Sequence, residues 1–107
     1  TITACDIITT VSLPALITAG SLSIQDNPAL TDISLISWVP PNGSINNFSD
    51  NALNLTSVNH ILAQAVANAA FVTGTITLFG GTNAAPAGQG ATDVTTLQGR
   101  GVTVTHN

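Results

Sequence analysis

The segment Ser23–Leu35, with the sequence SIQDNPALTDISL, decides the expected fold because similar segments lie on both sides of it. A shift of 22 positions aligns it with Thr1–Leu13, TITACDIITTVSL, at apolar and turn positions alike. The matched pairs are Ile2 with Ile24, Cys5 with Asn27, Ile8 with Leu30, Thr9 with Thr31, Val11 with Ile33, Ser12 with Ser34, and Leu13 with Leu35. A forward shift of 24 places Phe48, Asp50 and Asn51 on Ile24, Asp26 and Asn27.

Spacings of about 20 to 29 residues are typical of leucine-rich repeats. We therefore expect an α/β solenoid of this type, with short parallel strands, irregular return segments and a single repeat domain over residues 1–107. An Asn or Cys after each strand would supply hydrogen bonds to buried backbone groups where the chain turns. The alternative is that the Asp-Asn pairs mark ordinary surface turns.

Composition limits the classes of function. The chain has 107 residues, enough for one domain, of which 44% are hydrophobic and only 6% charged. A typical soluble domain has about 25% charged residues, so Thr, Ser and Asn must keep this surface hydrated, as is common in secreted or particle-surface proteins. The net charge is −4, and Arg100 is the only Lys or Arg residue. A nucleic-acid partner is excluded because several phosphates cannot be neutralised.

Cysteine content and hydropathy limit the covalent links, metal sites and membrane segments that the chain can have. Cys5 is the only cysteine, so neither an internal disulfide nor a Cys-based zinc site can form. No apolar run approaches the roughly 20 residues of a membrane helix, and no signal peptide is visible. Because the chain starts at Thr1 without a methionine, we expect either a processed start or part of a longer protein.

The periodicity of the chain changes after Leu55. Before it, apolar residues alternate as in half-buried strands, and the Pro40–Gly43 segment predicts a turn. An amphipathic helix is predicted at about 56–71, with Thr56 as its N-cap. A strand at Thr75–Phe79, a loop at Thr82–Thr92, a brief helix at Val94–Leu97 capped by Asp93, and a strand at Gly101–Thr105 follow. The predicted units are residues 1–22, 23–46 and 47–74, with a C-terminal cap at 75–107.

Several phrases resemble a known family. The segments Asn51–Leu53, Leu55–Leu62, Gly74–Leu78, Gly80–Pro86 and Gly101–Thr105 are similar to the C-terminal cap of leucine-rich-repeat surface proteins of bacteria and tailed bacterial viruses. The phrase LSIQDNPALT at Leu22–Thr31 resembles their repeats. The resemblance implies an exported or virion-borne structural or binding module, and it supplies no catalytic residues.

No residue pattern predicts catalysis, a cofactor or a metal site. His60 lies off the apolar stripe of the predicted helix, so we expect it to face solvent, and His106 is near the chain end. Asp26 and Asp50 are equivalent positions that would stack, but two carboxylates fall short of the six to eight oxygens that calcium prefers, so turn chemistry explains them better. No nucleophile, base and orienting group occur together, and we do not expect an enzyme.

The first unit is expected to carry the contact surface. Its first strand would leave an unpaired edge and uncovered apolar side chains, which either a longer chain or a partner subunit would cover. We expect residues Thr1–Ile8 to be buried against another polypeptide. The expected contact residues are Ile2, Ala4, Ile7, Ile8 and, at a separate place, Trp38. We therefore expect a capsid-decoration or tail component that binds protein subunits at the virion surface. The alternative is an extracellular adhesin that binds a carbohydrate or receptor with its Thr/Asn/Ser-rich strand face.

Overall fold

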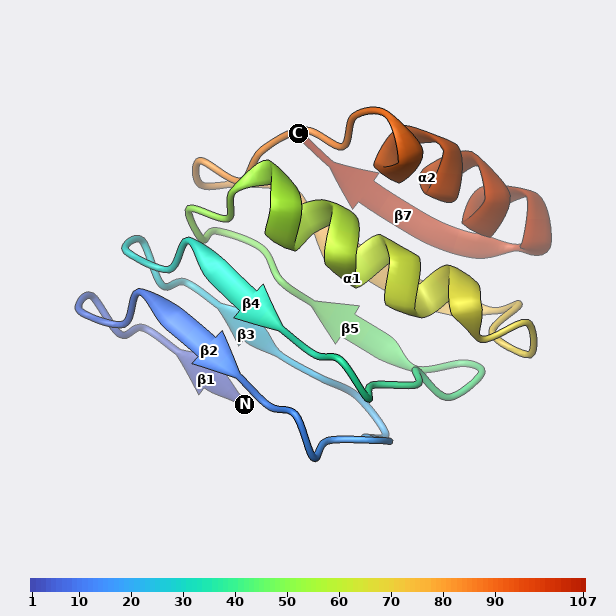
Figure 1. Ribbon diagram of the computed structural model, residues 1–107, viewed down its shortest axis with the longest axis horizontal. Coiled ribbons are helices and arrows are strands. Elements are labelled where there is room, and N and C mark those ends of the chain that lie inside the picture. Colours follow the sequence, from blue (N-terminus) through green and yellow to red (C-terminus); the bar gives the residue numbers. More distant parts are fainter.

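Two layers enclose one apolar core in the computed structural model, which describes residues 1–107 (Figure 1). The strand layer holds β1 (Ile2–Thr3), β3 (Ile24–Gln25), β5 (Ile45–Asn47), β6 (Gly74–Leu78) and β7 (Val102–His106). The mixed layer holds β2 (Thr10–Ser12), β4 (Asp32–Ser34), α1 (Leu55–Ala67) and α2 (Gln89–Arg100). The chain passes from the strand layer to the mixed layer after β1, β3, β5 and β6.

All strand pairs are parallel, and they form three small sheets, β1–β3, β2–β4 and β5–β6–β7. Ile2 pairs with Ile24 and Val11 with Ile33, the same residues that the 22-residue shift aligns. Between β3 and β5 only two isolated bridges form, Ser23 with Asn47 and Asn27 with Asn51.

The expected α/β solenoid of the leucine-rich-repeat type is wrong. The structure is a compact α/β domain with two helices and separate parallel sheets of two, two and three strands. Its radius of gyration is 12.3 Å, close to the roughly 13 Å of a compact domain of 100 residues. The physical reason is that the spacing is not constant: β3 follows β1 by 22 residues, but Ile45 pairs with Thr75 and Gly74 with Val102. The longer crossovers contain helices, which cover the core in place of further strands.

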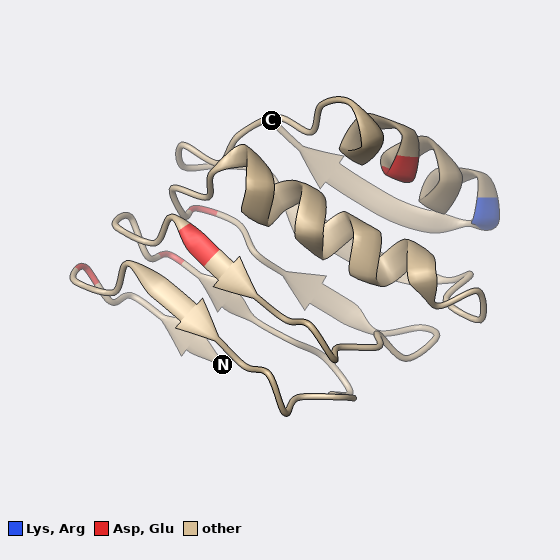
Figure 2. Ribbon diagram, in the orientation of Figure 1, with Lys and Arg blue, Asp and Glu red and all other residues tan.

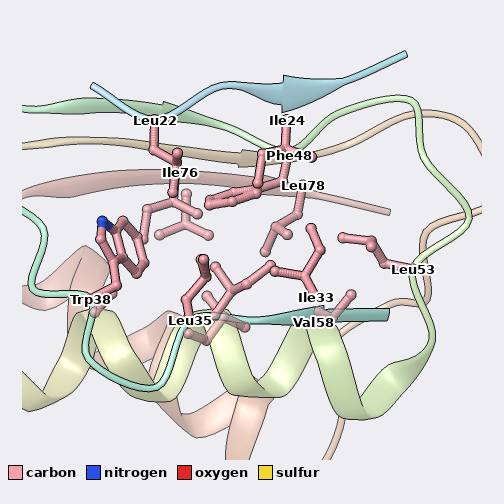
Figure 3. Close-up of a cluster of buried hydrophobic side chains, with 14 of the residues drawn as sticks. Leu22, Ile24, Ile33, Leu35, Trp38, Phe48, Leu53, Val58, Ile76 and Leu78 are labelled. Atoms are coloured by element: carbon pink, nitrogen blue, oxygen red, sulfur yellow. The ribbon is translucent and has the colours of Figure 1, made fainter. Parts of the chain in front are cut away.

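The core lies between the two layers. Figure 3 shows Leu22, Ile24, Phe48, Ile76 and Leu78 of the strand layer pointing toward Ile33, Leu35, Trp38 and Val58 of the mixed layer. The rings of Trp38 and Phe48 meet edge to face, with their centroids 5.9 Å apart. This geometry is favourable for aromatic pairs. Trp38 is fully buried, so the expectation that it lies on a contact surface is not met.

The helix expected at about 56–71 is present as α1, with a different cap. Asn54, not Thr56, is the N-cap: its backbone is extended, and its Oδ1 accepts the N–H of Ser57 at 2.9 Å. Asn satisfies this position well because its short side chain reaches the free N–H groups of the first turn. Arg100, from the end of α2, lies at the other end of α1.

The second helix is longer than expected. Residues 89–100 form α2, which includes part of the expected loop, and Asp93 lies inside the helix instead of capping it. The Gly and Thr residues of this segment have low helix propensity, so the sequence does not predict the full length of the helix. Packing compensates, because Val94 and Leu97 are buried and Gly90 lies against Asn59 of α1, where a Cβ would clash. Neither helix has the length and apolar character needed to cross a membrane.

Arg100 closes the carboxyl end of α1, and its removal should weaken the packing of the two helices. Its guanidinium donates to the carbonyl oxygens of Val66 at 3.0 Å and Asn68 at 3.2 Å. Arg100→Met keeps much of the apolar stem but loses both bonds and the favourable charge at a helix carboxyl end. We expect the free energy of unfolding to fall by about 1–2 kcal/mol in urea titrations. Gln98→Met, at an exposed position of α2, is the control and should change the free energy of unfolding little. Equal losses of this free energy in the two variants would contradict this role of Arg100.

Candidate functional site

Three of the strands end in a turn with the same unusual backbone. Ala4, Asp26 and Asp50 have φ values of 52°, 58° and 56°, in the left-handed region that L residues seldom adopt. Ala4 and Asp26 come directly after β1 and β3, and Asp50 comes three residues after β5; each stands directly before Cys5, Asn27 or Asn51. These turns send the chain from the strand layer to the mixed layer, and they leave backbone groups that no strand partner satisfies.

Buried asparagines supply the missing partners, and we call Asn27, Asn51 and Asn83 the asparagine ladder. Asn27 accepts the N–H of Cys5 at 3.0 Å and donates to the carbonyls of Ile2 and Gln25. Asn51 in turn accepts the N–H of Asn27 at 3.1 Å. Each side chain therefore joins its own turn to the preceding one.

The ladder continues through Asn51, which the shift of 24 aligns with Asn27, and then through Asn83, which neither shift aligns with Asn51. Asn51 donates to the carbonyls of Ile24 and Phe48 at 2.8 and 2.9 Å. Asn83 makes the next step by donating to the carbonyls of Phe48 and Leu78 and accepting the N–H of Leu53. Asn83 follows Asn51 by more than the 24 residues that separate Asn51 from Asn27, because Gly80 and Gly81, both with positive φ, lengthen this turn. All three ladder asparagines are buried.

The ladder positions the N-terminal edge, which we define as residues 1–16 with β1 and β2. Both strands lie at the end of their sheet and pair on one side only. Four apolar side chains of this edge are only partly buried against the core: Ile2, Ile8, Leu13 and Leu16. Their counterparts 22 residues later are 0% exposed: Ile24, Leu30, Leu35 and Trp38. The first set helps cover the second, and no part of the chain covers the first set to the same degree.

The predicted contact residues divide into three groups. Ile7 is 88% exposed, the highest value among the exposed large hydrophobic residues, and Ala4 is also exposed. Ile2 and Ile8 are half-buried. Trp38 is in the core and does not belong to this surface. Sequence analysis missed Leu13 and Leu16 as edge residues, although the 22-residue shift that aligns them with Leu35 and Trp38 is the signal that identifies them.

His60 was expected to face solvent, but the structure shows it partly buried. Its Nε2 accepts the backbone N–H of Leu35 at 2.9 Å, and its ring is partly buried. Burial lowers the pKa of His60 from its ordinary value of 6.5 because desolvation disfavours the charged ring. The side chain therefore fixes α1 to the end of β4.

Charges are few and separated. Figure 2 shows most of the acidic residues gathered on the side where β1, β3 and β5 end, while the one basic residue lies at the far end of α2. Hydrogen bonds from Thr31 and Asn54 hold the pKa of Asp32 below 3.8. No group of three or more His, Cys, Asp or Glu side chains is arranged to hold a metal ion, and no pocket opens on the surface.

The ladder should carry a large share of the stability of the turns. Asn51→Ala leaves the N–H of Asn27 and the carbonyl of Ile24 without their partner in a buried setting. Each such group costs about 1–3 kcal/mol, so we expect the free energy of unfolding to fall by about 3 kcal/mol or more. Chemical denaturation measures this value. Asn59→Ala is the control, since Asn59 makes one exposed bond to Ala87 and its buried Oδ1 has no partner; a similar loss in both variants would contradict the role of the ladder.

No family model matches the chain, and no curated protein or solved structure matches it either. The resemblance to leucine-rich-repeat surface proteins of bacteria and tailed bacterial viruses therefore stays a prediction from the sequence.

Proposed function

We propose that this domain is a non-enzymatic interaction module that binds another polypeptide through its N-terminal edge. The observation that carries the proposal is the contrast in burial between equivalent positions. Ile24, Leu30 and Leu35 are completely covered, whereas Ile2, Ile8 and Leu13, one turn earlier, are covered only in part. Ile2, Ile8 and Leu13 pack on the core next to their buried counterparts. A partner that packed on these three residues in the same way would complete the core.

The two ends of the domain differ in exposed apolar surface, and this difference favours the N-terminal edge as the binding surface. None of the exposed large hydrophobic residues lies beyond Phe79, and the outer surface of α2 presents Thr92, Thr95, Thr96 and Gln98. The N-terminal edge presents Ile7 and the free sides of β1 and β2 instead. Unpaired strand edges with apolar neighbours are templates for a further strand. A polypeptide with a strand and apolar side chains fits this chemistry better than a sugar or a nucleic acid does.

The setting is proposed from composition and resemblance. Low charge and abundant Thr, Ser and Asn are typical of exported or particle-surface proteins, and the resemblance is to surface proteins of bacteria and their viruses. We infer a place on the outside of a virion, as a capsid-decoration or tail component, where the edge would attach the domain to a neighbouring subunit.

Crosslinking at Ile7 tests the proposal. A photoreactive amino acid at position 7, introduced in the native source, should form an adduct with one protein of defined mass, and the same amino acid at Ile45 should not. Ile45 is a matched control because it is also an exposed isoleucine, at 63%, but lies on β5. With the adduct partner purified, Ile7→Glu should raise Kd about tenfold or more and Ile45→Glu should leave it nearly unchanged, since apolar anchors dominate protein interfaces. Adducts at position 45 alone, or equal effects of the two variants, would refute the proposal.

Glycan binding is a second candidate, favoured by the register of the strand layer. Ser23, directly before β3, pairs with Asn47 of β5, which pairs with Thr77 of β6, and Thr77 pairs with Thr105 of β7, so the four residues form one row. Adjacent strands are about 4.8 Å apart, so this row presents regularly spaced hydroxyl and amide groups without formal charge. The exposed ring of Phe79 lies one residue beyond β6.

A glycan array provides the test for this second candidate. Binding to neutral glycans is expected, with a loss in Phe79→Ala and none in Ile7→Glu, because only the former changes this face. An array without signal would remove the candidate and leave the protein-binding proposal in place.

A further inference from the structure

Helix α1 takes the place of a strand partner on one side of β4. β4 pairs with β2 on its other side. On the side of α1, the N–H of Ile33 donates to Ser57 Oγ at 3.0 Å, and the N–H of Leu35 donates to His60 Nε2 at 2.9 Å. Residues three apart share one side of a helix, and residues two apart point the same way on a strand. Two helix side chains therefore accept two alternate N–H groups, one from Ile33 within β4 and one from Leu35 directly after it.

Only one of these two acceptors titrates. The hydroxyl of Ser57 accepts a hydrogen bond at any ordinary pH. The Nε2 atom of His60 accepts one only while the ring is neutral and its proton is on Nδ1, because both nitrogens of the charged ring are donors. Protonation would therefore set an N–H of His60 against the N–H of Leu35.

No neighbouring charge is positioned to compensate. The charged groups on the elements that pack against α1 are Asp32 on β4 and Asp93 and Arg100 on α2. Asp32 accepts from Thr31 and Asn54, and Asp93 accepts from Gln89. Arg100 donates to carbonyls at the carboxyl end of α1. The His60 ring forms its hydrogen bond with the N–H of Leu35 alone.

We propose that His60 is an acid-released latch between α1 and β4, and that its protonation frees the N–H of Leu35 while Ser57 keeps the N–H of Ile33 bound. The end of β4 then opens while the start of α1 stays attached, because Asn54 also holds Asp32 there. The carbonyl of Ser34, next to Leu35, accepts the N–H of Leu13 in the N-terminal edge. If the edge binds a polypeptide as proposed above, acid would weaken that binding, but the latch itself does not depend on a partner.

The sign of the pH dependence follows from the lowered pKa. The folded state holds His60 below its ordinary pKa of 6.5, so at intermediate pH the unfolded state binds more protons than the folded state. The stabilisation by the latch is complete above about pH 6.5, and it is lost as the pH falls through the folded pKa.

Amide hydrogen exchange of the wild-type chain, measured by NMR at pH 7.5 and pH 5, tests the latch directly. After correction for the intrinsic pH dependence of exchange, the protection of the Leu35 amide should fall about tenfold, the effect of losing one hydrogen bond of ordinary net strength. The protection of the Ile33 amide, bound by the same helix through Ser57, should change much less. Equal losses at both amides would overturn the proposal, since they would show opening that does not depend on His60.

A substitution at the latch gives the second measurement. In His60→Gln an amide oxygen can accept the Leu35 N–H and does not titrate, so the difference in Leu35 protection between the two pH values should disappear. His106→Gln, at the exposed histidine near the chain end, should retain the wild-type difference. A pH-dependent loss that persists in His60→Gln, or that disappears in His106→Gln, would contradict the latch.

Discussion

The structure depends on supplying hydrogen-bond partners to backbone groups that are buried where the chain crosses between its two layers. Strands of two or three residues cannot do this for their own turns, and an unpaired buried N–H or C=O is costly. Side chains solve the problem at two places. The buried amides of Asn27, Asn51 and Asn83 link successive turns, and polar side chains of α1 serve the free side of β4. Very short strands can therefore support a core that includes Trp38 and Phe48 without a continuous sheet.

The same constraint explains why the two ends of the domain are unlike. Toward the C-terminus, the crossovers lengthen to hold helices, which both cover apolar side chains and provide polar groups to the neighbouring element. Arg100 of α2 thus closes the end of α1. Toward the N-terminus, the crossover contains only β2, and Cys5 occupies the place of a ladder asparagine. A cysteine side chain lacks the amide that would reach a further turn. The N-terminal edge is consequently the part of the domain that offers both unpaired strands and incompletely covered apolar groups.

The sequence predicts the local pairing well and the global arrangement poorly. The 22-residue shift aligns residues that do pair, such as Ile2 with Ile24, because the same alternation of apolar and polar side chains must face the same core. The 22-residue spacing does not continue along the chain as a solenoid would require, because helices set the spacing after β5 and the early segments do not determine the lengths of these helices. The helix at Gln89–Arg100 is hidden by Gly and Thr, and its stability comes from packing on α1. Among the residues predicted to make contacts, Ile7 is exposed, whereas the burial of Trp38 and the contact of His60 with Leu35 could be recognised only from the fold.

The ladder asparagines act as connected partners of the buried turns and not as independent surface residues. A double-mutant cycle with Asn27→Ala, Asn51→Ala and the combined variant tests this claim most directly, with the free energy of unfolding measured for each. The side chains of Asn27 and Asn51 are hydrogen-bonded to each other, so the two losses should not add, and a coupling of about 1 kcal/mol or more is expected. Losses that add to within about 0.5 kcal/mol, as for distant independent sites, would contradict the claim.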